Sequence, residues 1–190
     1  QAIYRTEYGD ILPSDIMLST AEMEFNAPRR EFMLEQHLRA VRNNYDFIII
    51  DTPPALNILT INAYVCSNAL IVPMEAEILS LVGVTQLQET IETVRSTFNP
   101  DLKVLGILLN KFTPRFILSR EVRDLADEVA RQLGTRVFKS KIRRSVHVAT
   151  APAHGQSVIT YAPDCKPALD LMRIIDIVAG DEFPRHGLYA

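Results

Sequence analysis

The sequence has few of the features that mark secreted, membrane-spanning or disulfide-stabilised proteins. Its two cysteines, Cys66 and Cys165, are far apart and have apolar or mixed surroundings, which favours reduced intracellular thiols over a disulfide framework. No apolar run approaches the 18 residues of a transmembrane helix, and the first residues do not form a signal peptide. These absences predict a soluble, cytoplasmic protein without a membrane partner.

Glycine-rich phosphate loops are also absent from the 190 residues. The seven glycines form neither Gly-x-x-x-x-Gly-Lys-[Ser/Thr] nor Gly-x-Gly-x-x-Gly. A dinucleotide site therefore finds no support, and these residues alone do not complete a cradle for the phosphates of a nucleotide. Because the sequence begins at Gln1 and not at a methionine, we expect it to be a fragment.

Apolar segments of strand length alternate with segments of helical periodicity. We predict strands over 45–51, 69–74 and 103–110, and helices over about 28–43, 55–66, 80–98, 117–133 and 166–179. Strands that are apolar on both faces and separated by helices indicate an α/β fold, a doubly wound, mostly parallel sheet with helices on both faces. With 47% hydrophobic residues in this length, we expect residues 1–190 to form a single domain.

The stretch YDFIIIDTPP, residues 45–54, ends an apolar segment at a carboxylate. In open parallel sheets, ligands bind beyond the carboxyl ends of the strands, where Asp51 is predicted to lie. The two prolines favour a stiff, extended exit from the strand. Asp51 either holds Mg²⁺ through water beside a phosphate or caps the helix that follows, and the residues themselves leave both interpretations open.

A basic window interrupts an otherwise acidic chain. No acidic residue occurs between Glu128 and Asp164, while the net charge of the whole chain is −3. The window carries six positive charges, which leaves −9 on the remainder; they are Arg131, Arg136, Lys139, Lys141, Arg143 and Arg144. Such asymmetry suggests an anionic partner, and the alternative for the short run KSKIRR is a solvated loop.

Two further features point less strongly to a site. His154 has no second His, Cys or acid beside it at metal spacing, so a loop histidine is the favoured interpretation. Glu75 and Glu77 follow the strand predicted over 69–74, where they either face the crevice or are ordinary exposed acids.

The last predicted helix has apolar residues at three-residue steps, namely Leu169, Met172, Ile175 and Val178. A membrane-surface helix would be enriched in Lys and Arg on its polar face, and this one is not. We therefore expect it to pack on the sheet.

Four ordered blocks give the sequence a family resemblance. They read ILPSDIMLSTAEMEF, YDFIIIDTPPALNILTINA, NPDLKVLGILLNKF and APAHGQSVITYAP. Together they resemble the ParA-type (Soj-like) partition ATPases, a deviant-Walker P-loop group that also includes MinD-like and nitrogenase-iron-protein-like ATPases. The resemblance runs from about residue 10 to about residue 179. It implies a P-loop NTPase-like fold whose first strand, P-loop and first helix would lie upstream of Gln1.

The resemblance implies roles for single residues. Asp51 resembles the catalytic Walker B acid, which would hold Mg²⁺ through water. Thr52 and Pro53 resemble the loop that senses the γ-phosphate, and Asn110 resembles the residue that recognises the adenine edge. The segment 142–155 resembles the part that lies over the base, with Arg143 toward the nucleotide, and leads to a DNA-binding surface that would use Lys139, Lys141, Arg143 and Arg144.

The resemblance also implies cofactors and partners. ATP and Mg²⁺ would join two copies into a homodimer that binds non-specific DNA on the nucleoid, and a ParB-like centromere-binding protein would stimulate hydrolysis. Two alternatives stay open: a MinD-like or other deviant-Walker ATPase with a non-DNA cargo, and a non-hydrolysing ParA-like binding module. The sequence departs from the family at Thr113, Arg143 and Thr150, where an acid, a proline and a glutamate are usual.

Overall fold

The computed structural model describes residues 3–15, 17–18, 28–53, 55–75, 81–113 and 118–182. The chain divides into two compact units, Gln1–Cys66 and Ser67–Ala190, and each is described by itself. That residues 1–190 act as a single domain stays a prediction.

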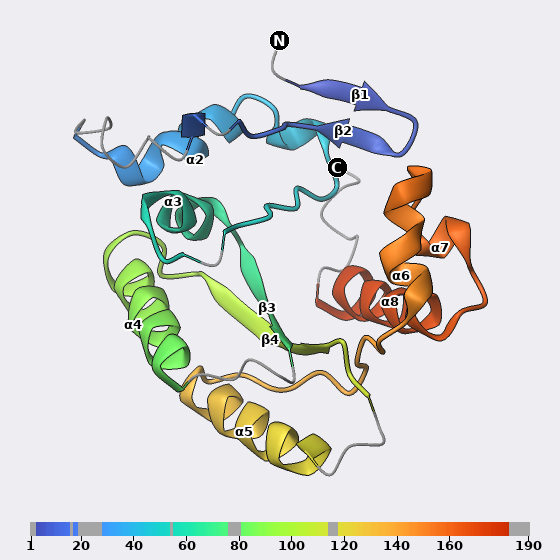
Figure 1. The fold of residues 1–190 in the computed structure, drawn as a ribbon. Coiled ribbons are helices and arrows are strands. Elements are labelled where there is room, and N and C mark those ends of the chain that lie inside the picture. The colour runs from blue at the N-terminus through green and yellow to red at the C-terminus, as the bar shows by residue number, and fades with distance from the viewer. Residues whose placement is uncertain are drawn as a thin grey trace. The chain divides into compact units, whose positions relative to one another are not determined.

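A short β-hairpin begins the first unit (Figure 1). Strands β1 (Tyr4–Thr6) and β2 (Gly9–Ile11) pair antiparallel across a two-residue turn. Gly9 has a φ of 134°, a conformation that residues with a Cβ rarely adopt. The hydroxyl of Tyr45 donates a hydrogen bond of 2.6 Å to the carboxylate of Asp10, which ties the hairpin to the segment that precedes Asp51.

The described helical turns of the first unit are η2 (Arg30–Phe32), α2 (Met33–Leu38), η3 (Arg42–Asn44) and α3 (Ile58–Cys66). The buried amide of Asn62 joins them. Its Oδ1 accepts a hydrogen bond from the N–H of Leu34 at 3.0 Å, and its Nδ2 donates to the carbonyl oxygen of Arg30 at 2.9 Å. A buried amide needs such partners, so Asn62 fixes α2 to α3. The helix predicted over 55–66 is confirmed as α3, whereas the stretch predicted as helical over 28–43 is broken into η2, the six-residue α2 and η3.

The strand predicted over 45–51 is wrong for this structure. Residues 47–50 form no strand, and the side chains of Phe47, Ile48 and Ile49 are exposed, with 93% for Ile49. A strand is held by ladder hydrogen bonds to a neighbour, and no described strand pairs with this segment. Apolar composition indicates that a segment suits a buried strand, but it does not provide the neighbour.

Parallel strands form the centre of the second unit. Strand β3 (Ala69–Glu75) pairs parallel with β4 (Lys103–Asn110), and Glu75 lies opposite Asn110. Two isolated parallel bridges continue the pairing into residues 136–144: Ile107 with Val137, and Phe112 with Arg143. Segment 136–144 therefore runs beside β4 as a broken third strand. The strands predicted over 69–74 and 103–110 are confirmed.

Gly106 allows segment 136–144 to approach β4 closely. A Cβ at this position would lie 2.8 Å from the carbonyl oxygen of Arg136 and 2.9 Å from Cε2 of Phe138. The backbone of Ile107 exchanges two hydrogen bonds with the segment, donating to the oxygen of Arg136 and accepting from the N–H of Phe138, both at 2.9 Å. Only glycine leaves room for this contact.

Helices lie on both sides of the β3–β4 pair (Figure 1). On one side are α4 (Leu81–Thr97) and α5 (Leu118–Gln132); on the other are α6 (Val146–Thr150), η4 (Ala151–His154), α7 (Val158–Tyr161), α8 (Lys166–Asp176) and the π-helical η5 (Ile177–Glu182). The helices predicted over 80–98, 117–133 and 166–179 are confirmed. The predicted α/β fold with a parallel sheet is confirmed as well.

The buried face of α8 is not the face formed by the apolar residues spaced three apart in the sequence. Its buried Ile174 joins a core cluster with Leu105, Phe138 and Ile142, and Leu171 packs against that cluster. The residues at three-residue steps, apart from Val178, are exposed: Leu169 at 45%, Met172 at 42% and Ile175 at 47%. Because α8 is apolar on both faces, periodicity predicted the helix but not its buried side.

Candidate functional site

The carboxyl ends of β3, β4 and segment 136–144 meet at one edge of the second unit. Glu75 and Asn110 are register partners there, and Arg143 lies opposite Phe112, two residues beyond Asn110. Ligands of open parallel sheets bind at such an edge. Parallel pairing thus brings two predicted site residues, Asn110 and Arg143, to the same edge.

Asn110 is oriented by the residue that follows it. Its Oδ1 accepts a hydrogen bond of 2.9 Å from the N–H of Lys111, which has a φ of 52°. Nζ of Lys111 lies 2.6 Å from Oε1 of Glu75 on the neighbouring strand. Within the described residues the amide nitrogen of Asn110 has no hydrogen-bond partner, so it keeps donor hydrogens for the edge of a ligand.

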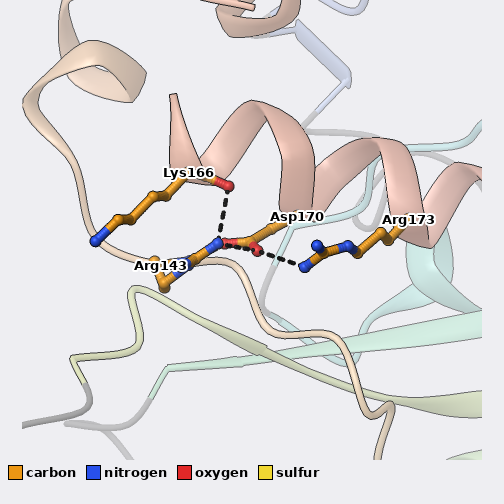
Figure 2. A network of polar contacts seen from close by, with 4 residues as sticks. All are labelled: Arg143, Lys166, Asp170 and Arg173. Atoms are coloured by element: carbon orange, nitrogen blue, oxygen red, sulfur yellow. Dashed lines mark hydrogen bonds and ion pairs between the residues drawn. The ribbon is translucent and has the colours of Figure 1, made fainter. Parts of the chain in front are cut away.

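The guanidinium of Arg143 is paired with the carboxylate of Asp170 on α8 (Figure 2). Nε donates to Oδ2 at 2.7 Å and Nη2 donates to Oδ1 at 2.6 Å, a two-pronged contact with a side chain that is 5% exposed. The hydrogen bond to Asp170 raises the pKa of Arg143 above its ordinary value, so the guanidinium stays charged. A contact of Arg143 with nucleotide or DNA stays a prediction, and its charge is directed at Asp170.

The other predicted DNA contacts differ in exposure. Lys139 and Arg144 are exposed, whereas Lys141 is half-buried with its Nζ 4.1 Å from the centroid of the Phe112 ring. Burial lowers the pKa of Lys141, and the electron-rich ring face offsets part of the lost hydration. Lys139 and Arg144 therefore present their charges to a partner more directly than Lys141 does.

A groove of about 580 Å³ lies next to this edge. Its walls are residues 112–113, residues 143–145, His147 and residues 164–167, which come from the exit of β4, the end of the broken strand, the start of α6 and the start of α8. Three cationic side chains line it, Arg143, Arg144 and Lys166, together with a single acid, Asp164. The groove is therefore predominantly basic.

The remaining predicted site residues belong to the first unit. Asp51 and Pro53 are exposed and Thr52 is half-buried, all on the irregular segment that follows residues 47–50. Pro54 and Glu77 lie outside the described residues. Because Asp51 belongs to the first unit and Asn110 to the second, their joint role in one site remains a prediction.

The exposed carboxylate of Asp51 suits a magnesium ion that keeps its water shell. Mg²⁺ takes oxygen ligands and retains several waters, so one carboxylate can be the protein's whole contribution. In the part of the chain that the structure describes, no cluster of three His, Cys, Asp or Glu side chains is arranged to hold a metal directly. A water-mediated contact is thus the form in which Mg²⁺ fits these residues.

Two points remain outside this site, the ring contact of His154 and the character of the helices. The ring of His154 stacks on that of Tyr161, with centroids 5.0 Å apart and planes inclined by 19°. His154 is the last residue of η4 and not a loop residue, and this ring contact is the role that the structure gives it. None of the described helices combines the length and the apolar character needed to cross a membrane.

Sequence reasoning missed Asp170. The available signal was an acid between two leucines, Leu169 and Leu171, on an apolar helix, which is a costly place for a charge without a partner. The partner, Arg143, is 27 residues away in the chain, so only folding reveals the pair.

Comparisons of the sequence identify related proteins. Residues 1–104 match a family described as "AAA domain". The chromosome partitioning protein ParA of Caulobacter vibrioides is 39% identical over 159 residues, 82% of this chain and 58% of that protein. The sporulation initiation inhibitor protein Soj of Bacillus subtilis is 38% identical over 168 residues, 86% of this chain and 65% of that protein. The chain therefore spans less than two thirds of these curated relatives.

A solved structure shares the fold. Cobyrinic acid a,c-diamide synthase from Mycobacterium smegmatis, with bound ATP analog and magnesium, superposes with a TM-score of 0.80 at 30% identity. The match covers 96% of this chain and 68% of that one. The α/β fold built around β3 and β4 is thus similar to that of a protein solved with a nucleotide analogue.

Proposed function

The chain belongs to the ParA-like family of partition ATPases with an AAA domain, and on this premise we propose that it acts in DNA segregation. ATP and Mg²⁺ would be its cofactors, and the ATP-bound homodimer would bind DNA without sequence preference. Hydrolysis, stimulated by a ParB-like centromere-binding protein, would release the DNA. The protein would work in the cytoplasm, on the nucleoid.

The chemistry is assigned to residues of both units. Asp51 would hold the water shell of Mg²⁺, with Thr52 and Pro53 next to the γ-phosphate, and the amide nitrogen of Asn110 would donate to the adenine edge. When bound, Mg²⁺ supplies positive charge that neutralises the phosphate oxygens. The protein's contribution to hydrolysis is then chiefly positioning and charge.

One observation carries the DNA-binding part of the proposal: the last residues of the basic window's cationic run, 142–144, are hydrogen-bonded to the exit of the strand that ends at Asn110. The N–H of Phe112 donates to the oxygen of Ile142 at 3.0 Å, and the N–H of Arg144 donates to the oxygen of Phe112 at 3.2 Å. Through Phe112, Asn110, the proposed contact to the base, is therefore connected to Arg144, whose charge suits a DNA phosphate. This arrangement supports DNA binding that depends on nucleotide.

Titration of labelled duplexes tests the proposal, with protein expressed from its whole reading frame. Two duplexes of unrelated sequence are titrated with ATP analogue and Mg²⁺, with ADP, and without nucleotide. We expect both duplexes to bind with similar affinity, and only with the ATP analogue. ATP hydrolysis without DNA binding in any state would favour a deviant-Walker ATPase with another cargo, and absence of both would favour a binding module.

A further inference from the structure

Asp170 is a buried carboxylate that the proposed chemistry does not use. It sits on α8 with 5% of its side chain exposed. A buried carboxylate is tolerated only when it is paired and hydrogen-bonded, because it loses its hydration. Arg143 provides three of these contacts: Nε and the backbone N–H donate to Oδ2 at 2.7 Å and 3.3 Å, and Nη2 donates to Oδ1 at 2.6 Å.

Arg143 contacts α8 at two residues, Asp170 and Lys166. Nη2 of Arg143 also donates to the backbone oxygen of Lys166 at 3.3 Å, so the guanidinium reaches the first turn of the helix as well (Figure 2). Nη1 of Arg173 is 3.8 Å from Oδ1 of Asp170, and its side chain is 65% exposed. Arg143 is therefore the principal counter-charge, and its planar fork defines one orientation.

The backbone of Arg143 connects this pair to the end of β4. Arg143 bridges Phe112 in parallel pairing, and Phe112 follows Asn110 by two residues. The hydrogen bonds from Phe112 to Ile142 and from Arg144 to Phe112 continue the connection. A continuous set of contacts thus links α8, segment 142–144 and the strand end that carries Asn110.

We infer that Arg143 and Asp170 form a positioning pair, which holds segment 142–145 against α8 so that Arg144 is presented to an anionic partner. Arg143 then acts through its neighbours and does not itself contact DNA phosphates. The inference deepens the proposed function and rests on it for the identity of the partner. Asp170 is the residue whose loss should release the segment.

Removing the carboxylate of Asp170 should change DNA affinity in opposite directions, depending on whether Arg143 positions the segment or contacts DNA directly. Asp170→Asn removes the negative charge that pairs with the Arg143 guanidinium and leaves one neutral acceptor oxygen, so a direct phosphate contact predicts tighter DNA binding. A positioning role predicts weaker binding, by roughly tenfold, because a misplaced segment loses on the order of one charge-assisted contact. Asp176→Asn, on an exposed site of the same helix, makes the same charge change and should not weaken binding.

Arg143→Lys provides a second variant in case Asp170→Asn fails to fold. Lysine retains the positive charge, and a direct phosphate contact should survive the change. It cannot donate two parallel hydrogen bonds to Asp170, so a positioning role predicts weakened binding here too. The inference is overturned if either variant folds and binds DNA at least as tightly as Asp176→Asn does.

Amide hydrogen exchange provides a readout that needs neither nucleotide nor DNA. In Asp170→Asn, the amides of Arg143 and Arg144 should exchange faster than in Asp176→Asn, because asparagine offers one neutral acceptor oxygen in place of two charged ones. The hydrogen bonds that hold Arg143 become weaker, and Arg144 is held through Arg143. Unchanged exchange overturns the inference even if the protein binds DNA. If the unaltered protein binds no DNA, the proposed function fails, and faster exchange still supports the positioning pair.

Discussion

Nζ of Lys141 lies 4.1 Å from the centroid of the Phe112 ring, and this cation–π contact joins the basic window to the exit of β4. The contact keeps Lys141 half-buried while Lys139 and Arg144 stay exposed. The cations of this short run are therefore not equivalent, although their sequence pattern treats them alike.

That difference predicts unequal salt effects on DNA binding. Lys139→Ala and Arg144→Ala should each lower the slope of log affinity against log salt by roughly one per protomer, since each lost phosphate contact releases fewer counterions. Lys141→Ala should change the slope less. Titrations of a labelled duplex at several salt concentrations measure these slopes. Unchanged slopes in all three variants would show that KSKIRR is a solvated loop.

Asp51→Ala should abolish Mg²⁺-dependent ATP hydrolysis in protein expressed from its whole reading frame. The side chain is exposed, so its loss should leave thermal unfolding unchanged. Phosphate release reports the activity, and Asp46→Ala, at an exposed acid of the same segment, is the matched control. Turnover within a few-fold of the unaltered protein would leave Asp51 as a cap.

Residues 1–190 expressed alone should bind Mg·ATP weakly or not at all. They contain no glycine-rich loop whose backbone N–H groups cradle phosphates, and the exposed Asp51 does not replace one. Titration calorimetry measures the affinity. A dissociation constant in the micromolar range would contradict this prediction.

Gly106→Ala should destabilise the second unit by about 1–3 kcal/mol, the usual cost of forcing an extra carbon into a packed site. The new Cβ would press on the backbone oxygen of Arg136 and on the Phe138 ring, so segment 136–144 would shift from β4. Urea unfolding measures the change. Gly180→Ala is the control, because a Cβ there meets no atom within 4 Å.

Stability should fall with rising pH because of Cys66. Burial raises the pKa of this thiol from 9.0 to about 11. Between these values the unfolded chain loses the proton that the folded chain retains, so the free energy of unfolding decreases as pH rises through that range. Urea unfolding of the unaltered protein and of Cys66→Ala measures the effect. An equal decrease in both would show that Cys66 does not contribute.

Local patterns of the sequence determined much of this protein. Apolar periodicity defined β3, β4 and the helices α4, α5 and α8, because the alternation of buried and exposed side chains is set by the backbone repeat within each element. The missing acids marked the basic window, and four ordered blocks indicated the family. These properties belong to neighbouring residues and need no knowledge of distant ones.

Pairing between distant residues was decided only by the tertiary structure. Segment 136–144 has no strand-like pattern, yet it lies beside β4 because Gly106 admits it. Residues 47–50 have such a pattern and no described strand to pair with. Arg143 reads as a cation for a partner, but it meets Asp170, 27 residues on, because a buried carboxylate requires a counter-charge. Which groups satisfy one another depends on the spatial arrangement of the whole unit, and a local sequence pattern does not contain it.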